Sequence, residues 1–140
     1  ISFQPEDYSF INGVKVDLNN TKDVTSSKRI LRKLKIAFEK RSREVKILKQ
    51  HIAECKTPFV VMGDFNDTPA SYTLAQMSKG LKNAFQEKGS GLAKTYNGAF
   101  PNFQIDYVLA SPEFCVETYK IVKKDYSDHY PIKVSLSLTQ

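Results

Sequence analysis

The feature that most constrains the fold is a short apolar run that ends in a cluster of polar residues. Residues 59–62 read Phe-Val-Val-Met. This run is too short for an independent helix, and its valines favour a strand buried on both faces. Gly63 ends the run, and the poor strand formers Asp64, Asn66 and Asp67 follow. Open α/β sheets gather functional side chains just beyond the carboxyl ends of strands. A local Asx turn explains the same residues equally well.

The composition indicates one globular domain of modest size. The chain has 140 residues, of which 26% are charged and 41% hydrophobic, and this length supports one core. No apolar run is long enough to cross a membrane, and no signal peptide is recognisable. Because the first residue is Ile1 rather than Met, we expect residues 1–140 to be a single partial domain whose N-terminal part is missing. The sequence does not assign a compartment.

The positive charge is concentrated in one segment. The net charge is +6, and residues 26–50 contain ten Lys and Arg against two Glu. Apolar residues recur there at helical spacing, which predicts one long helix from Ser26 to Glu54 with Ser26 or Ser27 as its N-cap. A basic face attracts polyanions, but a solvated helix face is the commoner explanation. The apolar stripe comprises Leu31, Leu34, Phe38, Val45, Leu48, Ile52 and Cys55, with a polar break at Arg41.

The other predicted elements are shorter. Residues 1–25 have the Pro, Asn and Gly content of loops and turns. A second helix is expected from about Ser71 to Leu81, with Ser71 as its cap and Leu74 and Met77 on its buried face. Alternating patterns predict strands at 105–110, 114–122 and 130–138. The cysteines, Cys55 and Cys115, lack the spacing of a metal site, and we expect both to be buried as small hydrophobic residues.

Two further polar clusters lie beside predicted strands. Asp106 interrupts the apolar run Ile105-Asp106-Tyr107-Val108, and a buried carboxylate is costly unless it has a partner. Asp128 and His129 directly precede the last strand, and an acid followed by an imidazole suits a metal site or an acid/base site. Each cluster alone also has a structural explanation, as a turn cap or an ordinary loop.

Taken together and in this order, the motifs resemble those of the endonuclease/exonuclease/phosphatase superfamily. The residues that carry the resemblance are Gly63-Asp64-Phe65-Asn66, then Ile105-Asp106-Tyr107, then Ser127-Asp128-His129-Tyr130-Pro131-Ile132. This superfamily includes deoxyribonucleases, deadenylases, sphingomyelinases and inositol-polyphosphate phosphatases. The resemblance extends over essentially the whole chain. It implies an α/β fold, a four-layer α/β sandwich of which this chain supplies mainly the C-terminal half.

The resemblance also implies phosphodiester hydrolysis that depends on Mg²⁺ or Mn²⁺, most simply on nucleic acid. By this analogy Asp64 orients or activates the attacking water, and Asn66 donates to a phosphate oxygen. His129 contacts the scissile phosphate, and Asp106 holds the His129 ring. Asp128 is the expected metal ligand, since Mg²⁺ prefers hard oxygen donors. Whether Asp64 or His129 is the general base stays open.

Two alternatives remain at this stage. One is a phosphatase or lipid phosphodiesterase of the same superfamily, and the other is a non-catalytic module that binds nucleic acid through the basic helix. Gln104 occupies a position where family members often carry Arg, which weakens any claim of an additional phosphate clamp there. The family's metal-binding glutamate and a further histidine have no counterpart here. We therefore expect the chain alone to be inactive, and to self-associate through the sheet face left uncovered.

Overall fold

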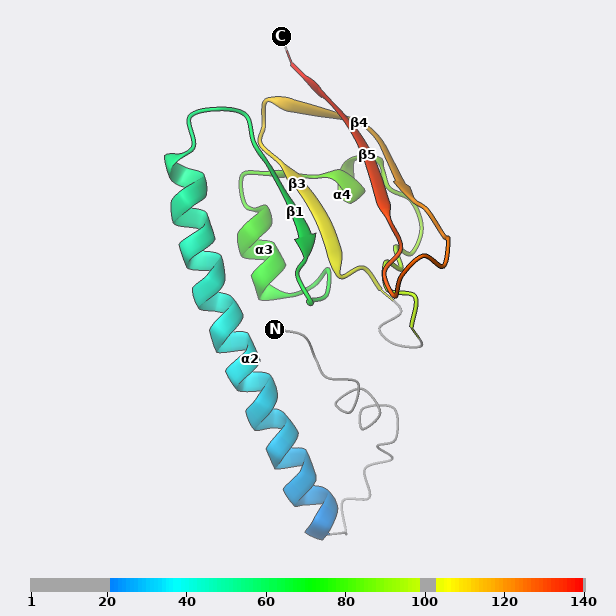
Figure 1. The fold of residues 1–140 in the computed structure, drawn as a ribbon. Helices are drawn as coiled ribbons and strands as arrows, with labels where there is room; N and C mark the ends of the chain where they lie inside the picture. The colour runs from blue at the N-terminus through cyan, green and yellow to red at the C-terminus, as the bar shows by residue number, and fades with distance from the viewer. Residues whose placement is uncertain (1–20, 99–102, 140) are drawn as a thin grey trace.

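The structure, a computed structural model, describes residues 21–98 and 103–139, so the loops predicted before residue 21 lie outside the described residues. Two antiparallel sheets form the centre of the fold (Figure 1), one ordered β1-β3-β2 and the other β4-β5. In chain order the elements are α2 (Thr21–Glu54), β1 (Val60–Asp64), α3 (Tyr72–Ser78), β2 (Lys82–Asn83), α4 (Ala84–Lys88), β3 (Asp106–Ala110), β4 (Phe114–Ile121) and β5 (Ile132–Leu138).

Helix α2 is the long helix that the sequence predicts, and it ends at Glu54 as expected. It begins at Thr21, however, so the predicted N-cap at Ser26 or Ser27 and the predicted loop over 21–25 are wrong. A serine is compatible with a cap and with a helix interior, so its presence alone does not locate the boundary. The C-terminal part of α2 lies beside α3 and the sheet, whereas its N-terminal part extends past them (Figure 1).

Strand β3 is the central strand and lies between two cores. Successive side chains of a strand point to opposite faces. Tyr107 and Leu109 accordingly pack with Val45, Leu74 and Met77 on the helical side. On the other side, Val108 packs with Ala84 of α4 and Val116 of β4. This arrangement confirms the α/β class, while the four layers of a complete sandwich remain a prediction.

Strand β1 follows the predicted position but not the predicted burial. In the described part of the chain it pairs with β3 alone, with Val61 opposite Leu109 and Asp64 opposite Asp106. Its residues range from half-buried to exposed, and Met62 is 68% exposed. The expectation of a strand buried on both faces is therefore wrong, since among the described residues the face that carries Met62 is left largely uncovered.

The remaining predictions have mixed outcomes. The Ser71 side chain caps α3 by accepting the Leu74 N–H at 3.1 Å, and the predicted residues of this helix, Leu74 and Met77, are buried. Cys55 is exposed and Cys115 only half-buried, so the expected burial of both is wrong. Cys55 lies directly beyond the last residue of α2, Glu54. Among the described residues, no helix has both the length and the apolar character needed to cross a bilayer.

The central strand provides a direct test of this core. Leu109 is fully buried, so Leu109→Ala should lower the free energy of unfolding by about 2–5 kcal/mol through lost burial and the cavity left behind. Leu92, which is 94% exposed, supplies the matched control, and Leu92→Ala should change stability by less than about 0.5 kcal/mol. Urea denaturation followed by circular dichroism measures both, and equal losses would contradict the assignment of β3 to the core.

Candidate active site

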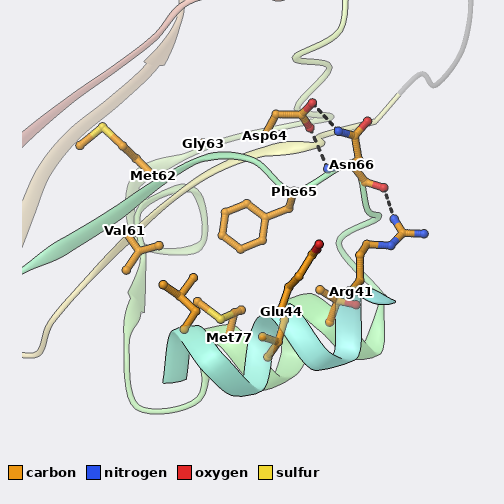
Figure 2. A pocket seen from close by; sticks show the side chains of 12 residues that line it. Arg41, Glu44, Val61, Met62, Gly63, Asp64, Phe65, Asn66 and Met77 are labelled. Carbon is orange, nitrogen blue, oxygen red and sulfur yellow. Dashed lines mark hydrogen bonds between the residues drawn. The ribbon is translucent and has the colours of Figure 1, made fainter. Parts of the chain in front are cut away.

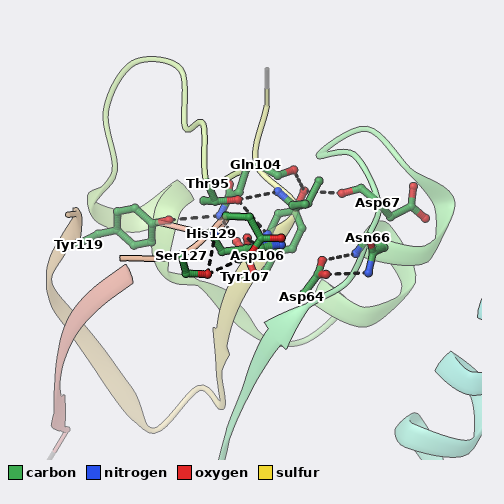
Figure 3. A network of polar contacts seen from close by, with 12 residues as sticks. Asp64, Asn66, Asp67, Thr95, Gln104, Asp106, Tyr107, Tyr119, Ser127 and His129 are labelled. Atoms are coloured by element: carbon green, nitrogen blue, oxygen red, sulfur yellow. Dashed lines mark hydrogen bonds and ion pairs between the residues drawn. The ribbon is translucent and has the colours of Figure 1, made fainter. Parts of the chain in front are cut away.

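The register of β1 and β3 places two carboxylates side by side. Asp64 is the last residue of β1 and Asp106 the first of β3, and they are direct antiparallel partners. Like charges directly opposite each other in a sheet are destabilising unless other groups offset them. Each carboxylate here has its own polar partner, and the two partners come from different loops (Figure 3).

The partner of Asp64 is Asn66, two residues later. The Asn66 backbone N–H donates to Asp64 Oδ1 and its side-chain Nδ2 donates to Oδ2, both at 2.7 Å. Asn66 has φ +48°, a left-handed conformation that asparagine adopts more readily than most residues. The local Asx turn is therefore real. It does not exclude a functional role, because a primary amide has two N–H groups and can hold Asp64 while donating to a ligand.

The partner of Asp106 is His129, as the sequence predicts. His129 Nδ1 lies 2.9 Å from Asp106 Oδ2, which confirms the predicted contact and explains why an acid is tolerated in this strand. The Tyr96 ring packs edge-on against the imidazole with 5.3 Å between the ring centroids. Because Nδ1 faces the carboxylate, Nε2 is the nitrogen that is available to a substrate.

Burial and charge act in opposite directions on these groups. Partial burial lowers the pKa of His129, but the hydrogen bond to Asp106 and the charges of Asp106, Asp64 and Asp128 together raise it above its ordinary value. Partial desolvation raises the pKa of Asp64, and the charge of Asp106 adds to this, while the Asn66 hydrogen bonds and the charge of His129 oppose it. The surroundings of His129 thus favour its protonated form beside the carboxylates.

Thr95, which the sequence analysis did not single out, joins the separate motifs. Its side chain is buried, and its Oγ1 accepts the backbone N–H groups of Ile105 at 3.0 Å and Asp106 at 3.2 Å. Its carbonyl oxygen accepts the Tyr130 N–H at 2.7 Å. Thr95 therefore fixes the start of β3 against the residue that follows His129. A lone threonine in a loop carries no sequence signal for this role.

Tyr107 and Gln104 form a second link, on the buried side of the site. The Tyr107 hydroxyl lies 2.8 Å from the Gln104 carbonyl oxygen and 3.1 Å from that of Asp67 (Figure 3). Burial and the nearby charges of Asp67 and Asp106 raise the pKa of Tyr107 well above its ordinary value. Gln104 is 2% exposed and donates to the Asp106 carbonyl oxygen at 2.8 Å. It is thus a structural amide and does not face a substrate.

Comparison with known proteins assigns the chain to a family. The sequence profile of the Endonuclease/Exonuclease/phosphatase family matches residues 33–129. The chain belongs to this family. A search of the curated proteins gives no significant match.

Solved structures of the endonuclease/exonuclease/phosphatase fold resemble this chain over part of their length. A mannosyl-6-phosphatase from Bacteroides thetaiotaomicron is 24% identical with a TM-score of 0.62, over 70% of this chain and 46% of that one. An endonuclease/exonuclease/phosphatase from Bacteroides vulgatus is 26% identical with a TM-score of 0.64, over 72% and 45%. The chain therefore corresponds to less than half the length of these proteins.

The described residues do not form a complete binding site for the divalent ion that the family implies. Within 21–98 and 103–139, no three His, Cys, Asp or Glu side chains gather as a metal site. Asp64 and Asp106 are each engaged by a polar partner, and the exposed Asp128 accepts a hydrogen bond from Ser127 Oγ at 2.9 Å. The carboxylates have the right chemistry for Mg²⁺, but they are too few and too dispersed to form a complete site.

The Asp106–His129 pair predicts a specific titration. Because the folded-state pKa of His129 is raised, this pair stabilises the fold most below the unfolded-state pKa of about 6.5, and the gain is lost as pH rises through the folded-state value. Asp106→Asn should lower the His129 pKa and remove this pH-dependent gain. NMR titration of the imidazole Hε1 signal measures the pKa, and His51→Gln assigns the signals. An unchanged His129 pKa in Asp106→Asn would contradict the pairing.

Proposed function

We propose that this chain contributes the acid/base half of a phosphoester hydrolase. The observation that carries the proposal is the His129 ring, held 2.9 Å from Asp106 beside the carboxylate of Asp64. An imidazolium that is fixed by one carboxylate and adjoins a second suits a reaction in which a proton moves and negative charge develops on phosphate oxygens. Family membership supports the same reaction class.

The proposed reaction is the attack of a water oxygen on phosphorus, with cleavage of the bond from phosphorus to the ester oxygen. Asp64 orients the water and accepts its proton while His129 is an imidazolium, and His129 can accept it instead only in its neutral form, with Nε2 unprotonated. The leaving oxygen takes up a proton from the Nε2–H of His129 or from solvent as the bond breaks. The Nε2–H of His129 and the Nδ2–H of Asn66 donate to the phosphate oxygens, where fixed donors stabilise the charge that develops.

Asp128 is the residue that we propose as a ligand for Mg²⁺ or Mn²⁺. Its carboxylate lies close enough to His129 for its charge to raise the pKa of the imidazole. A divalent ion bound there would neutralise phosphate charge. The described residues do not complete such a site, so none of the steps above depends on the ion.

Nucleic acid is the proposed substrate, and the basic residues of α2 support this choice. Lys35 and Lys40 are exposed, and each pairs only loosely with a glutamate four residues later, at 3.9 and 4.0 Å. Such surface pairs contribute little, so these cations stay available to a polyanion. A phosphatase or lipid phosphodiesterase is the alternative within the family. A non-catalytic nucleic-acid-binding module is the alternative outside enzyme function.

Substitution of Asp64 and His129, the two residues that we place at the reaction, tests the proposed hydrolase activity. In the full-length protein with Mg²⁺, Asp64→Asn and His129→Ala should each lower kcat by about 10²-fold or more, because each removes an acid/base or charge-stabilising group. Steady-state hydrolysis of DNA, RNA and small phosphate esters gives kcat and KM. The control is His51→Ala, which changes the exposed histidine at the end of α2 and should leave kcat unchanged.

Two results would overturn this assignment. A near-wild-type kcat in His129→Ala would remove the imidazole from the reaction. Full activity in a chelator such as EDTA would contradict the expected dependence on Mg²⁺ or Mn²⁺. Binding of nucleic acid without hydrolysis of any ester would instead favour the non-catalytic alternative.

The basic residues of α2 make a separate prediction about the substrate. If they contact a polyanion, the logarithm of nucleic-acid affinity should fall steeply with the logarithm of salt concentration. Reversing the charges of Arg32, Lys35 and Lys40 should then flatten that slope by about two to three units. The matched control reverses three exposed lysines outside α2, Lys88 of α4, Lys120 of β4 and Lys133 of β5. Equal salt slopes in both variants would indicate that the basic face of α2 is an ordinary solvated surface and does not contact nucleic acid.

A further inference from the structure

Arg41 differs from the other basic residues of α2 whose side chains are described. It is 4% exposed, whereas Lys49 is half-buried and the others are exposed, namely Arg32, Lys35, Lys40, Arg43 and Lys46. It lies in the wall of a hollow of about 270 Å³ between α2 and β1, directly below the turn that carries Asp64 and Asn66 (Figure 2). Neither the proposed chemistry nor the basic surface uses Arg41.

The buried guanidinium of Arg41 contacts the turn at two points. Its Nη1 donates to the carbonyl oxygen of Asn66 and lies 3.7 Å from Asp67 Oδ2. Both partners of this ion pair have side chains that are only 5% exposed. The guanidinium also stacks over the Phe38 ring, 5.1 Å from its centroid. Removing a charge from water in this way is costly and demands close geometry, so Arg41 has a defined position.

These contacts fix the peptide unit between Asn66 and Asp67. Arg41 holds its carbonyl oxygen, while the Asn66 N–H and side-chain amide are held by Asp64 at 2.7 Å. Tyr107 holds the next carbonyl oxygen, that of Asp67, at 3.1 Å. A residue other than glycine at φ +48° persists when its surroundings determine its conformation. The direction in which the Asn66 side-chain amide points therefore depends on α2 as well as on the turn itself.

We infer that Arg41 is a positioning residue of the active site. It sets the left-handed conformation of Asn66, and through it the direction in which the Asn66 amide donates to a phosphate oxygen. Arg41 acts through the backbone and does not touch the substrate. The inference rests on the proposed function for its catalytic consequence, but the structural coupling between Arg41 and Asn66 can be tested without any substrate.

The first measurement needs no activity. In the full-length protein, NMR signals of the Asn66 side-chain amide and backbone N–H are compared between wild type, Arg41→Met and Arg43→Met. Arg43→Met removes the same charge from an exposed position two residues away. We expect Arg41→Met to shift or broaden the Asn66 signals and Arg43→Met to leave them in place. Unchanged Asn66 signals in folded Arg41→Met would overturn the inference.

The second measurement is a double-mutant cycle in kcat. Arg41→Met should lower kcat about tenfold or more with KM within about threefold, as expected for a misaligned group. In an Asn66→Ala background the same substitution should cause little further loss, because Arg41 acts through Asn66. A purely structural role predicts the same fractional loss in both backgrounds, and that result would overturn the inference. So would a wild-type kcat in Asn66→Ala.

A conservative variant, Arg41→Lys, allows both measurements even if Arg41→Met does not fold. Arg41→Met leaves the Asp67 carboxylate without this cation, so the variant risks unfolding. Arg41→Lys retains the charge but lacks the planar guanidinium that stacks over Phe38 and donates to the Asn66 carbonyl oxygen. It should show smaller changes of the same kind, with kcat between wild type and Arg41→Met, and wild-type Asn66 signals and kcat in this variant would count against the inference. If wild type hydrolyses no phosphoester, the proposed function fails while the NMR comparison still decides the coupling.

Discussion

The site depends on how the fold tolerates two aspartates placed directly opposite each other. The pairing of Asp64 with Asp106 follows from the β1–β3 register, which the packing of Val61 and Leu109 also requires. Shifting the register by one residue would separate the acids, but it would also turn the apolar side chains of β1 to the wrong face. The repulsion is offset instead by His129 on one carboxylate and Asn66 on the other.

This compensation links parts of the chain that are distant in sequence. His129 comes from the loop before β5, and Thr95 and Tyr96 attach that loop to the start of β3. On the other side, α2 reaches the turn after β1 through Arg41. The charged centre is thus held in place by hydrogen bonds from loops that lack regular structure. Each of these bonds restricts the position of a group that adjoins the two carboxylates.

The sequence predicted the parts of this arrangement that have strong local signals. The long helix and the strands were accessible from periodicity. The acid within a strand implied that Asp106 has a partner, and the family resemblance identified that partner as His129. Arg41 and Thr95 were missed, since a basic residue on a basic helix and a threonine in a loop look ordinary. The burial of β1 was also misjudged. An apolar run reports what a strand can bury, but whether a neighbour covers it depends on the rest of the fold.

The site has two parts that respond differently to a change of pH, and the Tyr107 hydroxyl belongs to the part that keeps its protonation state. Its raised pKa and its two carbonyl neighbours keep the phenol protonated across the physiological range, so the link from β3 to Asp67 is independent of pH. The His129 imidazole, whose pKa is raised above its ordinary value by Asp106 and the neighbouring carboxylates, does change charge with pH. A change of acidity therefore alters the electric field at the carboxylates while the turn that presents Asn66 keeps its shape. The link that holds the turn and the group that titrates are thus different side chains, Tyr107 and His129.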